Sequence, residues 1–278
     1  MTSPARSVTV LPKDDVVSAL FASWDDIDDL MTPLPEEQWR APSHLQGWTV
    51  HCLVAHIIGT ELMLLGEPTP DVDVSASEHV RNEIGALNEA WVRHLSGQSG
   101  AQLLQTFRTV TDRRRAALAA LTDEQWNAVG VTPAGADSYG RFMRIRVFDC
   151  WMHEQDIRDA LALPATAEEL AGPAARIALD EIVASMGFVV GKRGRAPEGS
   201  RVEIELTGLL PRTIRVAVDG RAAVVDDFGG AAPTTTIRMD GVQFTRRCGG
   251  RTVGQDDVDY GGDQEVGRRI VENLAYVI

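Results

Sequence analysis

The sequence predicts an α+β protein made of an N-terminal helical bundle and a small C-terminal α+β domain. Before residue 190, apolar residues recur every three or four positions in several long segments, which is the period of amphipathic helices. After residue 200, polar and apolar residues alternate, which is typical of β-strands. Residues 191–200 are polar and rich in glycine, so we expect a linker there and two domains, 1–190 and 200–278.

The first helix is expected to begin near Pro12, because Asp14 and Asp15 then lie at the positive end of the helix dipole. Its apolar stripe consists of Val16, Val17, Leu20, Phe21, Trp24, Ile27 and Leu30. Thr49 is a suitable N-cap for a second helix, and Gly66 is a typical residue just beyond its end. Further helices are expected at about 79–96, 101–120, 139–162 and 173–190, and because no strand pattern lies between them they favour a bundle.

In the C-terminal part, strands are predicted at 201–206, 213–218 and 234–239. The second and third are each followed by Asp-Gly, a common turn signal. The chain then closes with a helical pattern over 264–276. This set predicts a small α+β domain.

Composition narrows the functional class. The chain is 44% hydrophobic and 24% charged, which is typical of soluble globular proteins, and no apolar run is long enough to span a bilayer. A net charge of −13 argues against nucleic acid or an anionic membrane as a partner. Three cysteines imply no disulfide framework, and the first residues lack the apolar core of a secretory signal, so a cytoplasmic location is expected.

Asp149 and His153 are the first candidates for chemistry. They lie four residues apart in an apolar helical segment, so their side chains share one helix face. A carboxylate and an imidazole at this spacing can hold one divalent metal in a bundle core. The alternative is a simple Asp–His hydrogen bond, although burying that pair without a further partner is costly.

His56, at the edge of the second helix's apolar stripe, is the natural third ligand. Two imidazoles and one carboxylate leave open positions on zinc or iron, which is typical of a catalytic site. Cys52 and Cys150 lie close to the histidines in sequence, so a thiolate-containing site is a rival, with buried structural cysteines as the simpler reading. A zinc-protease motif is excluded because Ile157 stands where a second histidine is required.

Residues 48–59 (WTVHCLVAHIIG) and 149–158 (DCWMHEQDIR) resemble the DinB-like superfamily, and more closely the actinobacterial mycothiol-dependent maleylpyruvate isomerase family. The resemblance implies a DinB-like four-helix bundle with a small C-terminal α+β domain. It also implies that His56, Asp149 and His153 bind a divalent metal, commonly zinc. In that family the carboxylate is more often Glu, and His51 and Cys52 stand where Arg or Lys and Asp are commoner.

The resemblance further implies a thiol cofactor, mycothiol, whose sulfur would take the open metal position. A cation favours the thiolate and lowers the thiol pKa from about 8.5. In isomerase members the thiolate adds to a conjugated cis double bond, and rotation and elimination give the trans product. In members similar to thiol S-transferases the sulfur stays attached to the electrophile. The expected partners are a small thiol and a maleylpyruvate-like electrophile, and the protein is expected to be a monomer or homodimer.

Supporting residues are expected on the same helices. Glu61 lies within the apolar arc of its helix, so it is a candidate catalytic or supporting acid, unless the helix register is shifted. Asp156 could orient an imidazole or pair with Arg158, and both are candidates for cofactor binding.

The C-terminal segment 244–251 resembles the family's loop-and-helix segment that ends in Gly-Arg. There a basic residue is expected to reach toward the bundle site and hold an anion, with Arg246 and Arg251 as candidate catalytic residues and Arg247 as a candidate cofactor-binding residue. Two other functions stay open, a non-catalytic DinB-like protein that binds a small ligand and a metal-dependent hydrolase. Glu61 and Glu154 are the nearby acids that could serve the hydrolase as a base.

Overall fold

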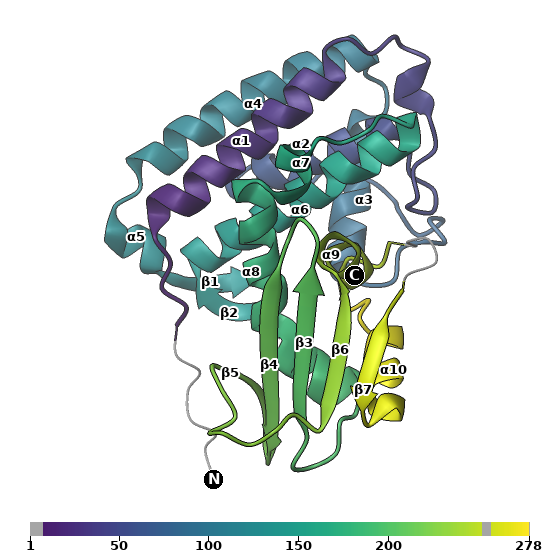
Figure 1. The fold of residues 1–278 in the computed structure, drawn as a ribbon. Helices are drawn as coiled ribbons and strands as arrows, with labels where there is room; N and C mark the ends of the chain where they lie inside the picture. Colours follow the sequence, from purple (N-terminus) through teal and green to yellow (C-terminus); the bar gives the residue numbers. More distant parts are fainter. Residues whose placement is uncertain (1–7, 252–256, 278) are drawn as a thin grey trace. The chain divides into compact units, whose positions relative to one another are not determined.

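The computed structural model describes residues 8–251 and 257–277. Residue contacts divide the chain into two units, Met1–Pro164 and Ala165–Ile278 (Figure 1). This division comes before the linker expected at 191–200. The reason is that helix α8 (Pro173–Phe188) packs against strands β4 (Arg212–Asp219) and β5 (Arg221–Val225), so it belongs with the sheet that follows it.

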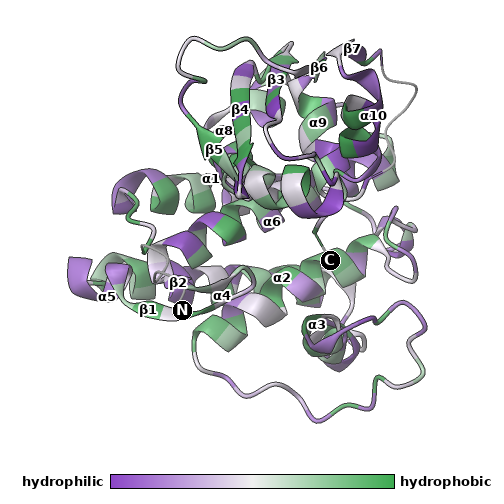
Figure 2. Ribbon diagram, turned by 90° about the horizontal axis from the view of Figure 1, so that it is seen from below, coloured by the Kyte–Doolittle hydropathy of each residue, from purple (hydrophilic) through white to green (hydrophobic). Residues whose placement is uncertain are grey.

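The first unit is helical, as predicted. Its helices are α1 (Lys13–Met31), α2 (Val50–Leu64), α3 (Glu83–Leu95), α4 (Gly100–Ala120), α5 (Asp123–Asn127) and α6 (Tyr139–Leu161), with a 3₁₀ turn at Gln38–Arg40. Helices α1 and α4 run side by side in Figure 1, and α1 also packs along α6. In Figure 2 apolar and polar residues alternate along these helices, which is the amphipathic pattern on which the prediction depended.

Local signals explain where the helices begin. The hydroxyl of Thr49 accepts a hydrogen bond from the backbone N–H of Cys52, which confirms the predicted N-cap of α2. Ser138 caps α6 in the same way. Helix α3 begins at Glu83, later than the expected residue 79, because Asn82 supplies its N-cap.

The expectation that no strand lies between the helices is wrong. Strands β1 (Val129–Thr132) and β2 (Gly135–Ser138) form an antiparallel hairpin directly before α6. Each strand has only four residues, and the second, GADS, carries no apolar alternation, so the pair is too short to show the period that predicts strands.

Asp137 at the end of β2 ties the N-terminal segment to α6. Its carboxylate accepts hydrogen bonds from the backbone N–H and hydroxyl of Thr9, from the backbone of Ser138 and from the guanidinium of Arg141. The side chains of Asp137 and Arg141 are each only 2% exposed. These bonds hold the start of the helix that carries Asp149 and His153.

The second unit contains a five-stranded sheet, and three of its strands, β3 (Arg201–Thr207), β4 and β6 (Thr235–Asp240), are the ones that the period-two pattern predicted. Its remaining elements are α7 (Ala167–Ala171), a π-helical turn (Val189–Arg193), α9 (Gly241–Cys248), β7 (Asp259–Gly262) and α10 (Gln264–Glu272). The strand order is β5-β4-β3-β6-β7, with β3 and β6 parallel and the other pairs antiparallel. Strands β5 and β7 were not predicted, and α10 ends at Glu272 and not at the expected residue 276.

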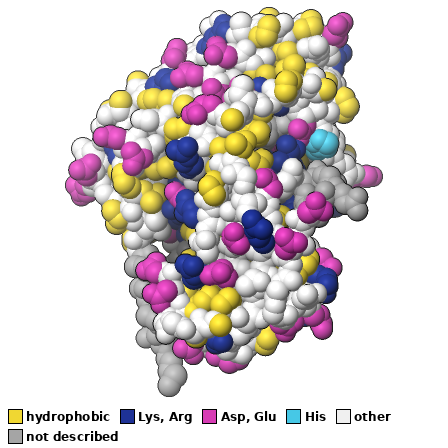
Figure 3. All heavy atoms as spheres, viewed as in Figure 1, with side chains coloured by type: hydrophobic (Ala, Val, Ile, Leu, Met, Phe, Trp, Pro, Cys, Tyr) yellow, Lys and Arg dark blue, Asp and Glu magenta, His cyan; other side chains and the backbone are white. Residues whose placement is uncertain are grey.

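The surface carries charged side chains of both signs (Figure 3). On the face in Figure 3, acidic side chains are interspersed with Lys and Arg. Within the described part of the chain, no helix combines the length and the apolar character needed to cross a membrane.

Candidate metal and active site

The structure brings together the three side chains that the sequence singled out as ligands. His56 projects from α2, and Asp149 and His153 project from α6. One potential ligand atom from each lies within 4.8 Å of the others. His56 Nε2 is 3.1 Å from Asp149 Oδ2, and His153 Nε2 is 3.5 Å from Asp149 Oδ1. Among the described residues, neither Cys52 nor Cys150 belongs to this cluster, so the thiolate-containing rival is not supported.

The cluster is sheltered but accessible at one point. The side chains of His56 and His153 are 6% and 7% exposed, whereas that of Asp149 is 27% exposed. Two imidazole nitrogens and one carboxylate oxygen form a donor set that suits zinc and other first-row divalent ions. The residues present therefore fit a divalent metal with further positions left for another ligand.

The two imidazoles are oriented in different ways. His153 Nδ1 donates a hydrogen bond to the fully buried carboxylate of Asp156 at 3.0 Å, which directs Nε2 toward Asp149. This favours the orienting role for Asp156. His56 Nδ1, by contrast, is buried without a hydrogen-bond partner in the described part of the chain, and its ring contacts the indole of Trp48 at 5.4 Å between centroids.

Electrostatics favours the metal-binding forms of two of these three groups, Asp149 and His56. Lost hydration would raise the pKa of Asp149, but Arg146, His56 and His153 outweigh it and hold that pKa well below its usual range. Burial lowers the pKa of His56, and Asp149 only partly offsets this. Burial would also lower the pKa of His153, but Asp149 and Asp156 reverse the sign and raise it. Metal binding requires an ionised carboxylate and neutral imidazoles, so Asp149 and His56 are already suited at neutral pH.

Glu61 lies inside the bundle, so the predicted inward register of α2 holds. Its side chain is fully buried, with Oε2 2.8 Å from Arg114 Nε and Oε1 2.9 Å from Arg146 Nε. Because both oxygens are ion-paired to guanidinium groups, Glu61 is not placed to act as a catalytic acid or base. Arg146 also donates a hydrogen bond to Asp149 Oδ2.

The other acid considered as a base is also engaged. Glu154 accepts a hydrogen bond from Arg158 Nε at 2.9 Å, and both residues are buried. Neither the carboxylate of Glu154 nor the guanidinium of Arg158 is therefore exposed to a substrate in solution. This weakens the hydrolase alternative and gives Arg158 a structural partner.

Trp48 is a site residue to which sequence reasoning gave no role. Its indole lies 5.4 Å from the ring of His56 and 6.4 Å from that of His153, between centroids. Its Nε1 donates to Glu89 Oε2 at 3.0 Å, and Glu89 also accepts from Ser77, His79 and Arg93. The indole is thus a fixed apolar wall beside the two imidazoles. Its presence in the segment 48–59 was the signal that could have found it.

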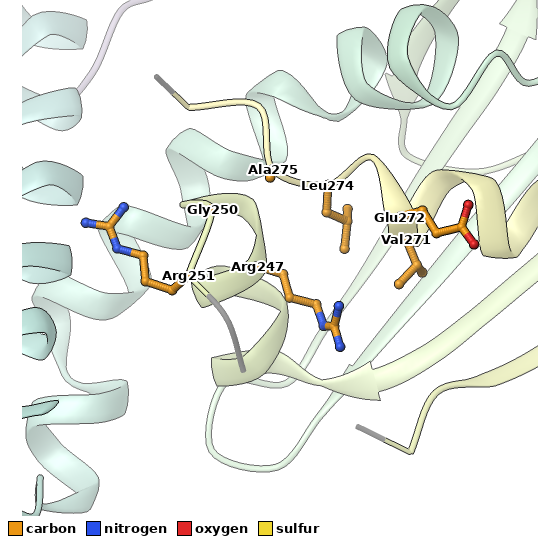
Figure 4. Close-up of a pocket in the computed structure, with 7 residues that line it drawn as sticks. All are labelled: Arg247, Gly250, Arg251, Val271, Glu272, Leu274 and Ala275. Carbon is orange, nitrogen blue, oxygen red and sulfur yellow. The ribbon is translucent and has the colours of Figure 1, made fainter. Parts of the chain in front are cut away.

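The arginines predicted in the C-terminal segment lie in the second unit, on and just after α9. Arg247 and Arg251 line a cavity of about 260 Å³, together with Gly250, Val271, Glu272, Leu274 and Ala275. In Figure 4, Arg247 extends toward the α10 side of this cavity, whereas Arg251 extends away from it. Arg246 is not among the residues that line it. The roles predicted for these arginines stay predictions.

Comparison with known sequences identifies the family. The sequence profile of the mycothiol maleylpyruvate isomerase N-terminal domain matches residues 20–158, which contain all three clustered side chains. The chain belongs to the mycothiol-dependent maleylpyruvate isomerase family. The profile of the family's C-terminal domain matches residues 176–269, which contain most of α8, the five-stranded sheet and α9.

The chain is also similar to an uncharacterised protein and, in its fold, to solved structures. An uncharacterised protein of Mycobacterium tuberculosis, found in strains CDC 1551 and H37Rv, is 29% identical over 154 residues. That match covers 54% of this chain and 58% of the relative, so the chain spans little more than half of that protein's length. Crystal structures of the mycothiol-dependent maleylpyruvate isomerase and of a histidine-to-alanine mutant superpose with TM-scores of 0.60 and 0.59 at 15% identity. Each covers 90% of this chain and 93% of its own, which confirms the predicted two-part DinB-like fold.

Proposed function

We propose that this protein is a divalent-metal-dependent enzyme that uses mycothiol to isomerise a small maleylpyruvate-like electrophile or to transfer the thiol to it. The observation that carries the proposal is the convergence of His56, Asp149 and His153 within 4.8 Å in a chain of this family. Family membership supports the thiol and the substrate class. The donor set supports the metal.

The chain's own residues would prepare the site for both. His153 offers Nε2 because its Nδ1–H donates a hydrogen bond to Asp156, and Asp149 offers its carboxylate in the ionised form. Trp48 contacts both imidazoles and shields them from water. Since Asp149 is the most exposed of the three ligands, a thiol and a substrate would approach from its side.

The metal and the thiol would supply the reactive chemistry. A bound divalent cation would lower the thiol pKa from about 8.5, so that a thiolate is available at neutral pH. Such a thiolate would supply the reversible addition to a conjugated double bond that cis–trans isomerisation requires. Arg246, Arg247 and Arg251 are proposed to hold anionic groups of the cofactor or substrate, because guanidinium pairs with carboxylate in a bidentate manner.

Metal analysis tests the first half of the proposal. The purified protein is expected to hold about one equivalent of zinc or a related ion, and His56→Ala and His153→Ala are expected to lose it while staying folded. His44→Ala is the matched control, because His44 is 52% exposed and lies outside the cluster. Wild-type protein that takes up no divalent metal would refute the proposal.

Thiol balance tests the second half. With maleylpyruvate, an isomerase turns over many equivalents of substrate and leaves the mycothiol concentration unchanged, whereas a transferase consumes one thiol for each product. In a cobalt-substituted sample, mycothiol is expected to change the visible spectrum by adding sulfur to the coordination of the ion. An unchanged spectrum, with ester hydrolysis that needs no thiol, would instead favour the hydrolase. Ligand uptake without any turnover would favour the non-catalytic binder.

A further inference from the structure

A continuous row of buried charged side chains from three helices leads to Asp149, one of the candidate metal ligands. Arg114 on α4 pairs with Glu61 on α2, and Glu61 pairs with Arg146 on α6. Arg146 then donates to Asp149 Oδ2. The side chains of Arg114, Glu61 and Arg146 are 2%, 0% and 3% exposed, so the row is closed to solvent up to Asp149.

Burying these charges costs free energy of hydration, so stability alone does not explain the arrangement. Buried ion pairs lose their hydration, and well-packed apolar residues often stabilise a protein equally well. One carboxylate between two guanidinium groups also leaves one positive charge over, and Asp149 is the next acid in the row. The excess positive charge of Arg146 is therefore directed at Asp149, which is one of the three candidate metal ligands.

The geometry of Arg146 suits it to hold another side chain in place. A guanidinium group is planar and rigid, so two bonds to different partners fix its orientation. Nε of Arg146 is bound to Glu61, and Nη1 is left to reach Asp149. Asp149 needs such a partner, because its side chain is the most exposed of the three candidate ligands.

We infer that Arg146, held by Glu61 and Arg114, is a positioning residue that fixes the Asp149 carboxylate for a divalent cation. The inference rests on the proposed function and deepens it. Arg146 ties one carboxylate oxygen, Oδ2, and so leaves Oδ1 as the freer donor beside His153. Glu61 acts through Arg146 and does not touch the reacting groups.

Metal titration of the full chain tests the inference without any turnover assay. Metal-free protein is titrated with Co²⁺ and Zn²⁺, and the dissociation constants and cobalt spectra are compared for wild type, Arg146→Met, Arg146→Lys and Glu61→Gln. Losing a group that orients a ligand costs metal affinity about 10- to 100-fold. We expect Arg146→Met to show a loss of this size with an altered cobalt spectrum. Arg146→Lys keeps the charge but loses the fork, so it should restore part of the affinity. Glu61→Gln should weaken binding in the same direction.

Arg141→Met is the matched control. Arg141 lies on the same helix, is 2% exposed and pairs with the buried Asp137. Its loss should lower the stability of the fold and leave the cobalt dissociation constant of the folded protein within about twofold of wild type.

Each outcome decides the matter. Folded Arg146→Met with wild-type affinity and spectrum would overturn the inference, and so would tighter binding, since the guanidinium would then compete with the cation. If no Arg146 variant folds, Glu61→Gln decides, because it keeps the size and shape of the side chain. A wild-type protein that binds no metal would refute the proposed function itself, whereas equal binding by wild type and variants would refute only this inference.

Discussion

Replacing Asp137 by Asn is expected to lower the free energy of unfolding of the first unit by about 3–5 kcal/mol. The carboxylate accepts four hydrogen bonds, at 2.7 and 2.9 Å from Thr9, 2.8 Å from Ser138 and 2.8 Å from Arg141. An amide turns an NH₂ group toward two of these donors in either orientation. Bonds to a charged group contribute roughly 1.5–3 kcal/mol each, so two lost bonds give roughly 3–6 kcal/mol, which agrees with the expected loss.

Urea denaturation followed by tryptophan fluorescence measures this loss. Trp126 is a suitable reporter, because its indole donates to the carbonyl of Leu11 in the segment that Asp137 holds. Asp28→Asn is the control, since Asp28 pairs with Arg108 at the surface, where the two side chains are 28% and 42% exposed. Such a pair contributes about 0–1 kcal/mol. If both variants lose the same stability, the reasoning from burial is refuted.

The same group predicts a pH dependence. Burial would raise the pKa of Asp137, but the bonds from Arg141, Thr9 and Ser138 hold it well below its usual range. Its contribution to stability is therefore complete above the unfolded-state pKa of about 3.9 and is lost as the pH falls through the folded-state value. Below about pH 4, wild type should lose stability more steeply than Asp137→Asn.

Three further predictions concern the interior. Burial raises the pKa of Cys150 to about 12, so iodoacetamide at pH 8 should label the half-buried Cys52 first, as mass spectrometry would record. Gly59→Ala should lower the free energy of unfolding by about 1–3 kcal/mol in urea, because the added methyl group would overlap the side chain of Trp91. Asp156→Asn should weaken Co²⁺ binding about 10- to 100-fold by releasing the imidazole that it orients, measured by cobalt titration.

Each of these has a matched control. In urea both Cys52 and Cys150 should react, and equal rates in the native protein would contradict the argument from burial. Gly97→Ala should change stability by less than about 0.5 kcal/mol, since an added methyl group there meets no atom within 4 Å. Asp159→Asn, also on α6 but 26% exposed, should keep wild-type cobalt affinity, and an equal loss in both variants would remove the special role of Asp156.

Much of the fold could be predicted because helix signals are local. Thr49 marked the start of α2, and the apolar period marked the buried face of α1. Strand β7 escaped prediction because Asp259–Gly262 has no apolar alternation and is a strand only through pairing with β6. A strand of this kind is defined by its neighbour, which lies elsewhere in the sequence.

In the candidate site too, some residues could be predicted from local sequence and others could not. His56, Asp149 and His153 were predicted because residue type and helical spacing carry their chemistry. Arg114 was missed because it lies between Arg113 and Arg115, which are 48% and 27% exposed, and nothing in that run marks the middle residue as buried. The inward-facing Glu61 was the available signal, since a buried carboxylate requires a buried cation.

Asp149, His153 and Asp156 all belong to α6, whereas His56 belongs to α2, 93 residues before Asp149. An ion shared by both helices would therefore be a reversible cross-link that closes a long loop of chain. At a free concentration one hundred times its dissociation constant, it would add about 2.7 kcal/mol to the folded state. Chelators should then lower the melting temperature of the bundle. The ion would stabilise the fold in addition to its proposed part in catalysis.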